Sequence, residues 1–339
     1  MEEKQKKVTI YDVAKRASVT IATVSRVING KDNVALDTKE RVMKAIEELN
    51  YYPSPIASGL SSSRSQQIGV LVPFFFGEFF LKVLQNIVKE LENYEVILYD
   101  ASTPEMKKKL LAKMAGENKL DGLLMVSMPL LPDEEFMVRN VRFPIILLDN
   151  KHKEHHSVYF DNIIGSFNAV NYLIQLGHKR TAIITGASEE PFNTSVAKDR
   201  LQGYKMALSM AGIPVQDRYI EISDWSRDGA YKLATKLLQL KERPTAIFAV
   251  SDIQAVGVLE AAKDLGLRVP EDLSVLGYDN MDFADYIGLS TVDQPLSMLA
   301  QIGLRMLMEE IGRVSKKKES IVLLPALVSR NTTSETVEL

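Results

Sequence analysis

The side chains best suited to bind a small ligand stand at the ends of short apolar runs. They are Phe74, Phe75, Phe76, Ser127, Asp149, Asp252 and Asp279. Carboxylates and hydroxyls form hydrogen bonds with a polyol, and aromatic faces pack against its apolar C–H surface. This combination favours a sugar or a similar small polar ring as the ligand. An aspartate in such a position can equally cap the helix that follows it.

Motifs for catalysis and for cofactor binding are largely excluded. The chain has no cysteine, which rules out disulfides, iron–sulfur clusters, thiolate zinc sites and cysteine nucleophiles. The two closest glycines, Gly116 and Gly122, are six residues apart, whereas the common dinucleotide, serine-hydrolase and nucleotide-phosphate motifs need closer pairs. We therefore expect neither an enzyme nor a bound cofactor. The remote alternative is a sugar-active enzyme that uses paired aspartates such as Asp149 and Asp279 for acid–base catalysis.

Three of the four histidines fall in the segment KHKEHH, at His152, His155 and His156. Such a group suggests a metal site, but Glu154 is the one carboxylate within the segment, which is typical of a polar connection. We therefore predict a surface loop and no metal site. His178 follows an expected helix and precedes basic residues, so we expect it to interact with the carbonyl end of that helix.

The elements that must position these side chains are strands alternating with helices. After Ile68, nine runs rich in Val, Ile and Leu alternate with helix-length segments: IGVLVP, YEVILYD, DGLLMVSM, PIILLDN, SVYFDN, RTAIITG, RYIEIS, TAIFAVSD and LSVLGYDN. This alternation predicts right-handed βαβ units and parallel sheets covered on both faces. Nine strands are many for one sheet, so we expect two lobes, with the first break near residues 161–165. Ligands in such folds lie beyond the carboxyl ends of the strands.

The first 65 residues form a basic head, with a net charge of +3 against −6 for the remainder. Three apolar stripes in this head predict short helices, which begin after Thr9, after Thr20 and near Val42. Thr9 and Thr20 are the expected N-caps. Two eight-residue helices across a three-residue turn fit a helix-turn-helix, and a basic head on an acidic body is expected when one end meets a polyanion. The alternative is a small helical cap on a larger domain.

The second helix of a helix-turn-helix enters the major groove of DNA with its N-terminal residues. The residues expected to face bases are Ile21, Ala22 and Arg26. The residues expected to reach phosphate are Thr20, Thr23, Ser25 and Asn29, and Thr9 is also assigned to the DNA contact.

The segments VTIYDVAKRASVTIATVSRVING and RVMKAIEELNYYPSPIASGL resemble the head of the lactose repressor family of bacterial transcription regulators. The resemblance continues through IGVLVP, LGHKR, RLQGY and GYDN, so it covers nearly the whole chain. It implies a homodimer on a near-palindromic operator and a small-molecule effector, a mono- or disaccharide, held between two lobes. It also adds Arg200 of RLQGY and Trp225 to the expected effector site, although a lone tryptophan is often a core residue.

The segment PSPIASGLSSS, residues 53–63, has the composition of a flexible linker. Ser54 and Pro55 nevertheless suit a helix start, and Ile56, Ala57 and Leu60 would share one helical face. A helix this short does not persist alone. The family resemblance implies a hinge helix that folds on DNA, where Leu60 wedges between base steps and Ala57 lies beside it. The alternative is an unstructured tether.

We therefore expect a small all-α helix-turn-helix domain at residues 1–52, a hinge at 53–65 and an α/β body at 66–339. The body should resemble periplasmic binding proteins and serve for effector binding and dimerisation. Its first lobe is expected at about 66–162 and 291–322, and its second at about 163–290 and 323–339. The N-terminus lacks the apolar core of a signal peptide, and no apolar run reaches the ~18 residues of a membrane span, so we expect a cytoplasmic protein without membrane contact.

A second function fits the same architecture. Catabolite control proteins bind a phosphoprotein co-regulator, and the segments EEPFN and KDRLQGYKMAL resemble them. Such a partner needs a basic surface for its phosphate, whereas the stretch MDFADYIGLS after GYDN is acidic and has no arginine. We therefore rank effector control by a small molecule first.

Overall fold

The computed structural model describes residues 8–28, 33–51, 65–73, 77–91, 93–117, 119–187, 192, 194–311 and 318–336. The chain divides into two compact units, Met1–Gln66 and Gln67–Leu339.

The first unit contains the three expected helices, α1 (Ile10–Ala17), α2 (Ile21–Ile28) and α3 (Leu36–Glu48). Thr20 caps α2, because its Oγ1 accepts a hydrogen bond of 3.2 Å from the amide of Thr23. Thr9 precedes α1, and both its amide and its hydroxyl donate to the carboxylate of Asp12, at 2.9 and 2.7 Å. The apolar stripes of the three helices pack on one another around Val13, Val24, Val42 and Ala45. The helix-turn-helix spacing predicted from the sequence is thus confirmed.

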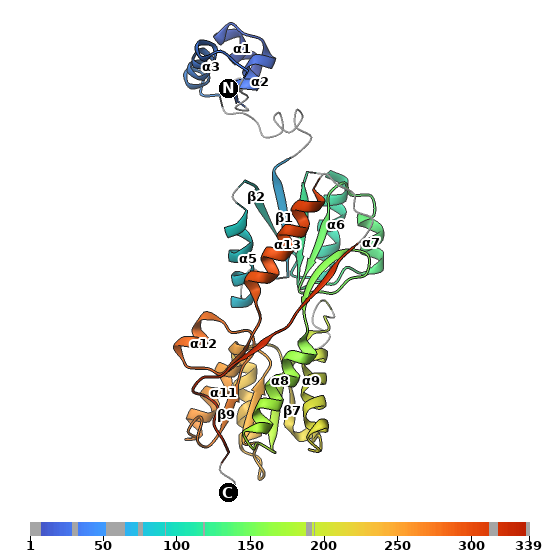
Figure 1. The fold of residues 1–339 in the computed structure, drawn as a ribbon, viewed down its shortest axis with the longest axis vertical. Coiled ribbons are helices and arrows are strands. Elements are labelled where there is room, and N and C mark those ends of the chain that lie inside the picture. Colours follow the sequence, from blue (N-terminus) through green and yellow to red (C-terminus); the bar gives the residue numbers. More distant parts are fainter. Residues whose placement is uncertain are drawn as a thin grey trace, which may run out of the picture. The chain divides into compact units, whose positions relative to one another are not determined.

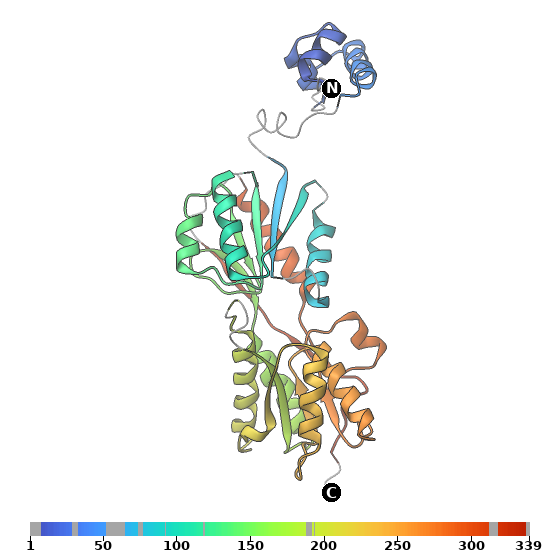
Figure 2. The ribbon, with the colours of Figure 1, turned by 180° about the vertical axis from the view of Figure 1, so that it is seen from behind.

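The second unit begins with a six-stranded parallel sheet, the first lobe (Figure 1). Its strands are β1 (Gln67–Val72), β2 (Glu95–Asp100), β3 (Gly122–Val126), β4 (Ile145–Leu148), β5 (His156–Phe160) and β11 (Ser320–Leu323). They lie in the order β11-β5-β4-β3-β1-β2. Helices α5 (Glu78–Glu90) and α13 (Leu296–Glu310) cover one face, and α6 (Pro104–Glu117) and α7 (Pro132–Val138) cover the other (Figures 1 and 2).

The two covered faces explain why these strands are apolar without alternation. In β3, Leu124 and Val126 join the core beneath α5 and α13, whereas Leu123 and Met125 join the core beneath α6. Successive side chains of a strand point to opposite faces, so a sheet buried on both sides needs apolar residues at every position.

The second lobe is built around a four-stranded parallel sheet in the order β7-β6-β8-β9. The strands are β6 (Thr181–Gly186), β7 (Ile220–Ser223), β8 (Ala246–Ala249) and β9 (Ser274–Leu276). Helices α8 (Asn162–Gln175) and α9 (Val196–Met210) cover one face, and α10 (Arg227–Leu238) and α11 (Asp252–Asp264) cover the other. The short elements are the 3-10 turn η1 (Asp217–Tyr219), α12 (Asp282–Tyr286) and the antiparallel pair β10 (Thr291–Asp293) and β12 (Ala326–Val328).

All nine runs expected to be strands form strands, whereas β10, β11 and β12 were not anticipated.

The chain passes between the lobes after β5, after β10 and after β11. The lobes also touch through side chains, because Lys82 Nζ on α5 lies 2.8 Å from Asp282 Oδ1 on α12. Within the described ranges, no helix has both the length and the apolar character needed to span a bilayer.

The histidines depart from the sequence-based expectation. The segment KHKEHH is a surface connection, as expected, with Lys151, Lys153 and Glu154 exposed, but its histidines turn inward. His156 is the buried first residue of β5, and the side chains of His152 and His155 are only 15% and 21% exposed. Burial lowers the pKa of His155 to about 4. His178 lies past the end of α8, buried, with its ring 2.9 Å from the hydroxyls of both Thr245 and Ser274. It therefore fastens the end of α8 to two strands of the second sheet, and the predicted role at the helix terminus is wrong.

Candidate functional site

The residues expected to contact DNA lie on the side of α2 that the core leaves free. Val24 and Val27 are buried, whereas Ile21, Ala22 and Arg26 are exposed. Thr23 and Ser25 are partly exposed, and Thr9 and Thr20 are exposed at the starts of α1 and α2. A buried stripe with an exposed opposite face is what a recognition helix needs. Asn29, Ala57, Leu60, Phe74 and Phe75 lie outside the described residues.

The strand order of each sheet reverses next to its first strand. In the first lobe β1 lies between β2 and β3, and in the second lobe β6 lies between β7 and β8. Parallel sheets bind ligands at such points, beyond the carboxyl ends of their strands. Ser127 and Asp149 follow β3 and β4 there, and the Ser127 hydroxyl donates a hydrogen bond of 2.7 Å to Asp149 Oδ2.

Arg200 is the centre of the polar network in the second lobe. It lies on α9 with its side chain 5% exposed, and its Nε donates a hydrogen bond of 2.9 Å to Asn162 Oδ1. Its Nη1 donates to the carbonyl of Val250 and lies 3.5 Å from Asp279 Oδ1. The guanidinium carbon lies 3.7 Å from the ring centroid of Tyr278. A buried guanidinium held at several points is fixed in orientation.

Three members of this network were not predicted: Asn162, Tyr278 and Gln294. The Nε2 of Gln294 donates a hydrogen bond of 2.6 Å to Asp279 Oδ1. Asn162 and Tyr278 lie in the runs SVYFDN and GYDN, so the strand-end rule could have included them. Gln294 follows β10. Because the sequence pattern did not predict β10 as a strand, the strand-end rule could not include Gln294.

Two polar atoms of this network have no hydrogen-bond partner among the described residues. They are the hydroxyl of Tyr278 and Oε1 of Gln294, and both are buried. Buried polar atoms are almost always hydrogen-bonded in folded proteins. These two atoms are therefore able to bind polar groups of a ligand.

The backbone is also unusual at the strand ends. Ser127, Asp149, Trp225 and Asp279 have φ values of 52°, 57°, 64° and 111°, in the left-handed region that side chains other than glycine rarely adopt. Each such residue costs on the order of 1–3 kcal/mol, and this kind of strain accumulates at functional sites. Four residues predicted from strand ends or family resemblance thus share one backbone signature.

The carboxylates from the two lobes interact electrostatically. Burial raises the pKa of Asp149 to about 6, against the Ser127 hydrogen bond and the positive charge of Arg200. Burial likewise raises the pKa of Asp279, which also feels the negative charges of Asp252 and Asp149. Asp149 belongs to the first lobe, and Arg200 and Asp279 belong to the second, so both lobes contribute to one charged site.

Asp252 has a different role from the other strand-end aspartates. Its side chain is fully buried and accepts hydrogen bonds from the hydroxyl of Thr291 and from the amide of Met281. Asp252 therefore holds the segment after β9 and the start of β10 against α11.

Trp225 follows β7 at the carboxyl edge of the second sheet, with its indole packed on the backbone of Gly186 at the end of β6. A Cβ added at Gly186 would lie 1.9 Å from Cε2 of the indole. The side chain is partly buried and also borders the core beneath α8 and α9. No hydrogen bond or ring contact joins it to Arg200 in the described part of the chain, so its place in the effector site remains a prediction.

Comparison with known proteins identifies the class of both units. Residues 9–54 match the model for bacterial regulatory proteins of the lacI family. Residues 170–333 match the model for a periplasmic binding protein-like domain. The helix-turn-helix and the two-lobed α/β body thus each have a counterpart.

Whole-chain relatives agree with this assignment. Catabolite control protein A of Priestia megaterium is 35% identical over 325 residues, which cover 94% of this chain and 96% of that protein. The lac repressor dimer bound to operator and the anti-inducer ONPF is 28% identical, with a TM-score of 0.82 over 97% of this chain and 100% of that chain. The transcriptional regulator CelR–cellobiose complex is 28% identical, with a TM-score of 0.70 over 96% and 99%.

The chain belongs to the lacI family of bacterial regulatory proteins. It is a DNA-binding transcriptional repressor of that family with a ligand-binding body, as the resemblance in the sequence implied. These relatives are transcriptional regulators and not enzymes.

Proposed function

We propose that this repressor binds a near-palindromic operator as a homodimer and that a small neutral sugar, held between its lobes, controls its operator affinity. Ser127, Asp149, Arg200 and Asp279 would hold the sugar, with Trp225 as a stacking face. The observation that carries this proposal is the network around Arg200, in which side chains of both lobes interact. A ligand that bridges two lobes can change their relative position, and such closure is a common route to a regulatory switch.

The charge of the site favours a neutral polyol over an anion. Arg200 is one positive charge, and the carboxyl groups of Asp149, Asp252 and Asp279 lie close enough to interact with it. A phosphate or carboxylate ligand would place a further negative charge beside these buried carboxyl groups, which already disfavour ionisation. Hydroxyl groups can instead donate to the carboxylates and accept from Arg200 and Tyr278. The cellobiose bound to the relative CelR is a neutral disaccharide and supports this ligand class.

The DNA-binding surface supports the operator part of the proposal. Arg26 is exposed beside Ala22 and Ile21 on the free side of α2, where an arginine can donate to a guanine edge. One such head makes few contacts, so specific binding needs two heads on two half-sites. The lac repressor structure is a dimer on its operator. We assign residues 53–65, with Ala57 and Leu60, to the hinge between head and body.

A thermal-shift screen of the full chain tests the ligand class, because a ligand that binds only the folded state raises the melting temperature. The screen should contain neutral mono- and disaccharides beside their phosphate esters. We expect a neutral sugar to raise the melting temperature and to change operator affinity in fluorescence anisotropy. Stabilisation by phosphate esters alone would contradict the assignment.

Arg200→Lys supplies the residue test. Lysine keeps the charge but cannot reach Asn162 and Asp279 together as a guanidinium does. We expect sugar affinity in calorimetry to fall at least tenfold while operator binding is retained. Arg218→Lys, on the exposed surface of the same lobe, is the matched control and should bind sugar like the wild type. Unchanged affinity in Arg200→Lys would remove Arg200 from the site.

The similarity to catabolite control protein A favours a second candidate, a regulator that works with a phosphoprotein co-regulator. On α12, Asp282 and Asp285 pair with Lys82 and Arg330, so these basic side chains are already matched and offer little to a phosphate. An operator-binding assay with the sugar and the candidate phosphoprotein added separately distinguishes the two. The proposal requires a response to the sugar alone.

A further inference from the structure

The segment KHKEHH meets α7 and forms a compact group of three potential metal ligands. Nε2 of His152 and Nε2 of His155 lie 3.7 and 3.8 Å from the same atom, Oε1 of Glu135. The two imidazole rings are 5.1 Å apart, and one ligating atom from each of the three residues lies within 4.8 Å of the others. Glu135 comes from α7 and the histidines come from the connection between β4 and β5, so no local pattern in the sequence links this carboxylate to the histidines.

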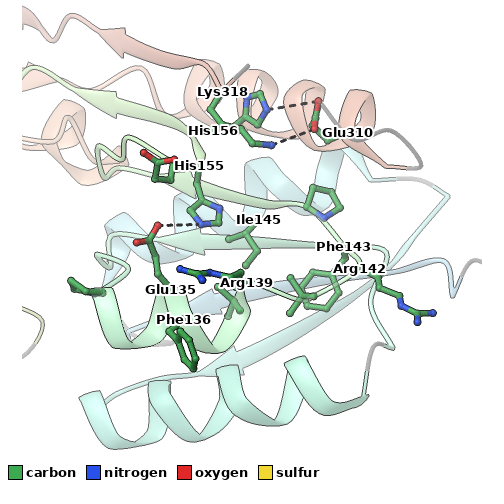
Figure 3. Close-up of a pocket in the computed structure, with 15 residues that line it drawn as sticks. Glu135, Phe136, Arg139, Arg142, Phe143, Ile145, His155, His156, Glu310 and Lys318 are labelled. Carbon is green, nitrogen blue, oxygen red and sulfur yellow. Dashed lines mark ion pairs between the residues drawn. The ribbon is translucent and has the colours of Figure 1, made fainter. Parts of the chain in front are cut away.

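The group lies at the wall of a cavity rather than on an open surface. The side chains of His152, His155 and Glu135 are 15%, 21% and 32% exposed. Glu135 and His155 line a cavity of about 850 Å³, together with Arg139, Phe143 and Ile145. Figure 3 shows Glu135 and His155 pointing toward one another there.

We propose that Glu135, His152 and His155 bind one Zn²⁺ or a similar divalent transition-metal ion. Two imidazole nitrogens and one carboxylate oxygen are a donor set that zinc commonly accepts, with a fourth position left for water or another small ligand. Bonds of about 2.0–2.1 Å in a tetrahedral site place neighbouring donor atoms roughly 3.3 Å apart. The two carboxylate–imidazole separations therefore need to close by about 0.5 Å, and the imidazole–imidazole separation, which is within 4.8 Å, by at most about 1.5 Å. Side-chain rotation can supply such movements.

Two neighbouring contacts bear on this site. The amide of Glu154 donates a hydrogen bond of 3.1 Å to Nδ1 of His152, so coordination through Nε2 would move the ring hydrogen to Nδ1 and release this contact. The positive charge of Lys318 acts on His155, but its Nζ also lies 3.6 Å from Glu310 Oε2, which offsets that charge. The bound ion would tie α7 to the segment that leads into β5.

Calorimetric titration of ZnCl₂ into the chelator-stripped full chain tests the proposal. We expect one ion per chain, with the affinity at least tenfold weaker in Glu135→Gln and in His152→Gln. Glu154→Gln is the matched control, because it removes the same charge beside the histidines and leaves all three donors in place. Its affinity should equal that of the wild type. Equal affinity in Glu135→Gln and the wild type, or equal losses in Glu135→Gln and Glu154→Gln, would overturn the proposal.

Cobalt supplies a readout that does not depend on the variants. Co²⁺ bound in the wild type should give the intense visible absorption of a four-coordinate ion, and X-ray absorption of the zinc form should show histidine scattering. A six-coordinate spectrum without histidine scattering would show that the ion is held by exposed carboxylates elsewhere. Circular dichroism checks that each variant folds. If His152→Gln does not fold, the less buried Glu135→Gln decides the outcome together with the spectra.

Discussion

Asp149→Asn should stabilise the protein, and the gain should grow with pH. The pKa of Asp149 rises from an ordinary value of 3.8 to about 6 because the carboxyl group is buried. Below pH 3.8 it is protonated in both the folded and the unfolded state, so folding buries no charge and carries no free-energy cost from this group. Between pH 3.8 and about 6 this carboxyl group ionises in the unfolded chain but stays protonated in the folded protein, so the free energy of unfolding falls as the pH rises. Above about pH 6 the group is ionised in both states, and the free energy of unfolding falls no further. Asparagine stays neutral, can accept from Ser127 and tolerates the left-handed backbone at this position.

The magnitude follows from about 1.36 kcal/mol per pKa unit. The free energy gained by Asp149→Asn should be about 1.5 kcal/mol at pH 5 and about 3 kcal/mol at pH 8. These are upper values, because Asp149 keeps part of its surface exposed. Urea unfolding followed by circular dichroism at the two pH values measures the difference.

Asp217→Asn is the matched control for this experiment. Asp217 is exposed in η1, so its carboxylate keeps its hydration on folding and the substitution should change stability little at either pH. A gain for Asp149→Asn that does not grow between pH 5 and pH 8 would refute the reasoning, because it would show a carboxylate that remains hydrated in the folded state. The same variant should bind the sugar more weakly, which would separate stability from function at this residue.

Two further substitutions test other parts of the molecule. Gly186→Ala should displace the indole of Trp225, cost ~1–3 kcal/mol of stability by overpacking, and shift the emission of the chain's single tryptophan before any ligand is added. Unchanged emission would contradict the packing described here. Arg26→Ala should cost ~1–3 kcal/mol in operator affinity and relax the preference at one base pair, measured by anisotropy on operator variants. A uniform loss across all variants would instead place Arg26 on phosphate.

Much of the fold could be predicted from the sequence because its signals are local. The spacing of Ile10, Ile21 and Val42 sets three helical stripes, and the nine apolar runs form strands because both sheet faces are covered. The short strands β10, β11 and β12 were not predicted from the sequence. Each has three or four residues, and β11 carries the exposed residues Ser320 and Val322 of an edge strand.

The candidate site was only partly predictable, because its contacts join distant segments. Ser127, Asp149 and Asp279 follow from the strand-end rule, but nothing local in the sequence links Gln294 to Asp279 or Asn162 to Arg200. The group of Glu135, His152 and His155 could not be predicted from the sequence for the same reason. Glu154 is the carboxylate next to the histidines in the sequence, whereas the fold supplies Glu135 from α7, a helix that precedes them.

The position of α13 and β11 in the first lobe constrains the order in which the chain can fold during synthesis. Five strands of that sheet are complete at residue 160, but α13, which covers half of one face, begins at residue 296, and the edge strand β11 ends at residue 323. About 135 residues must therefore leave the ribosome before Ile146, Leu148 and Val158 are covered, which takes on the order of 10 s at ~5–20 residues per second. The sheet of the second lobe, in contrast, is continuous in sequence from β6 to β9. The sheet whose strands are made first is thus covered only after the second sheet is complete, and its uncovered apolar face is where aggregation would begin or a chaperone would bind.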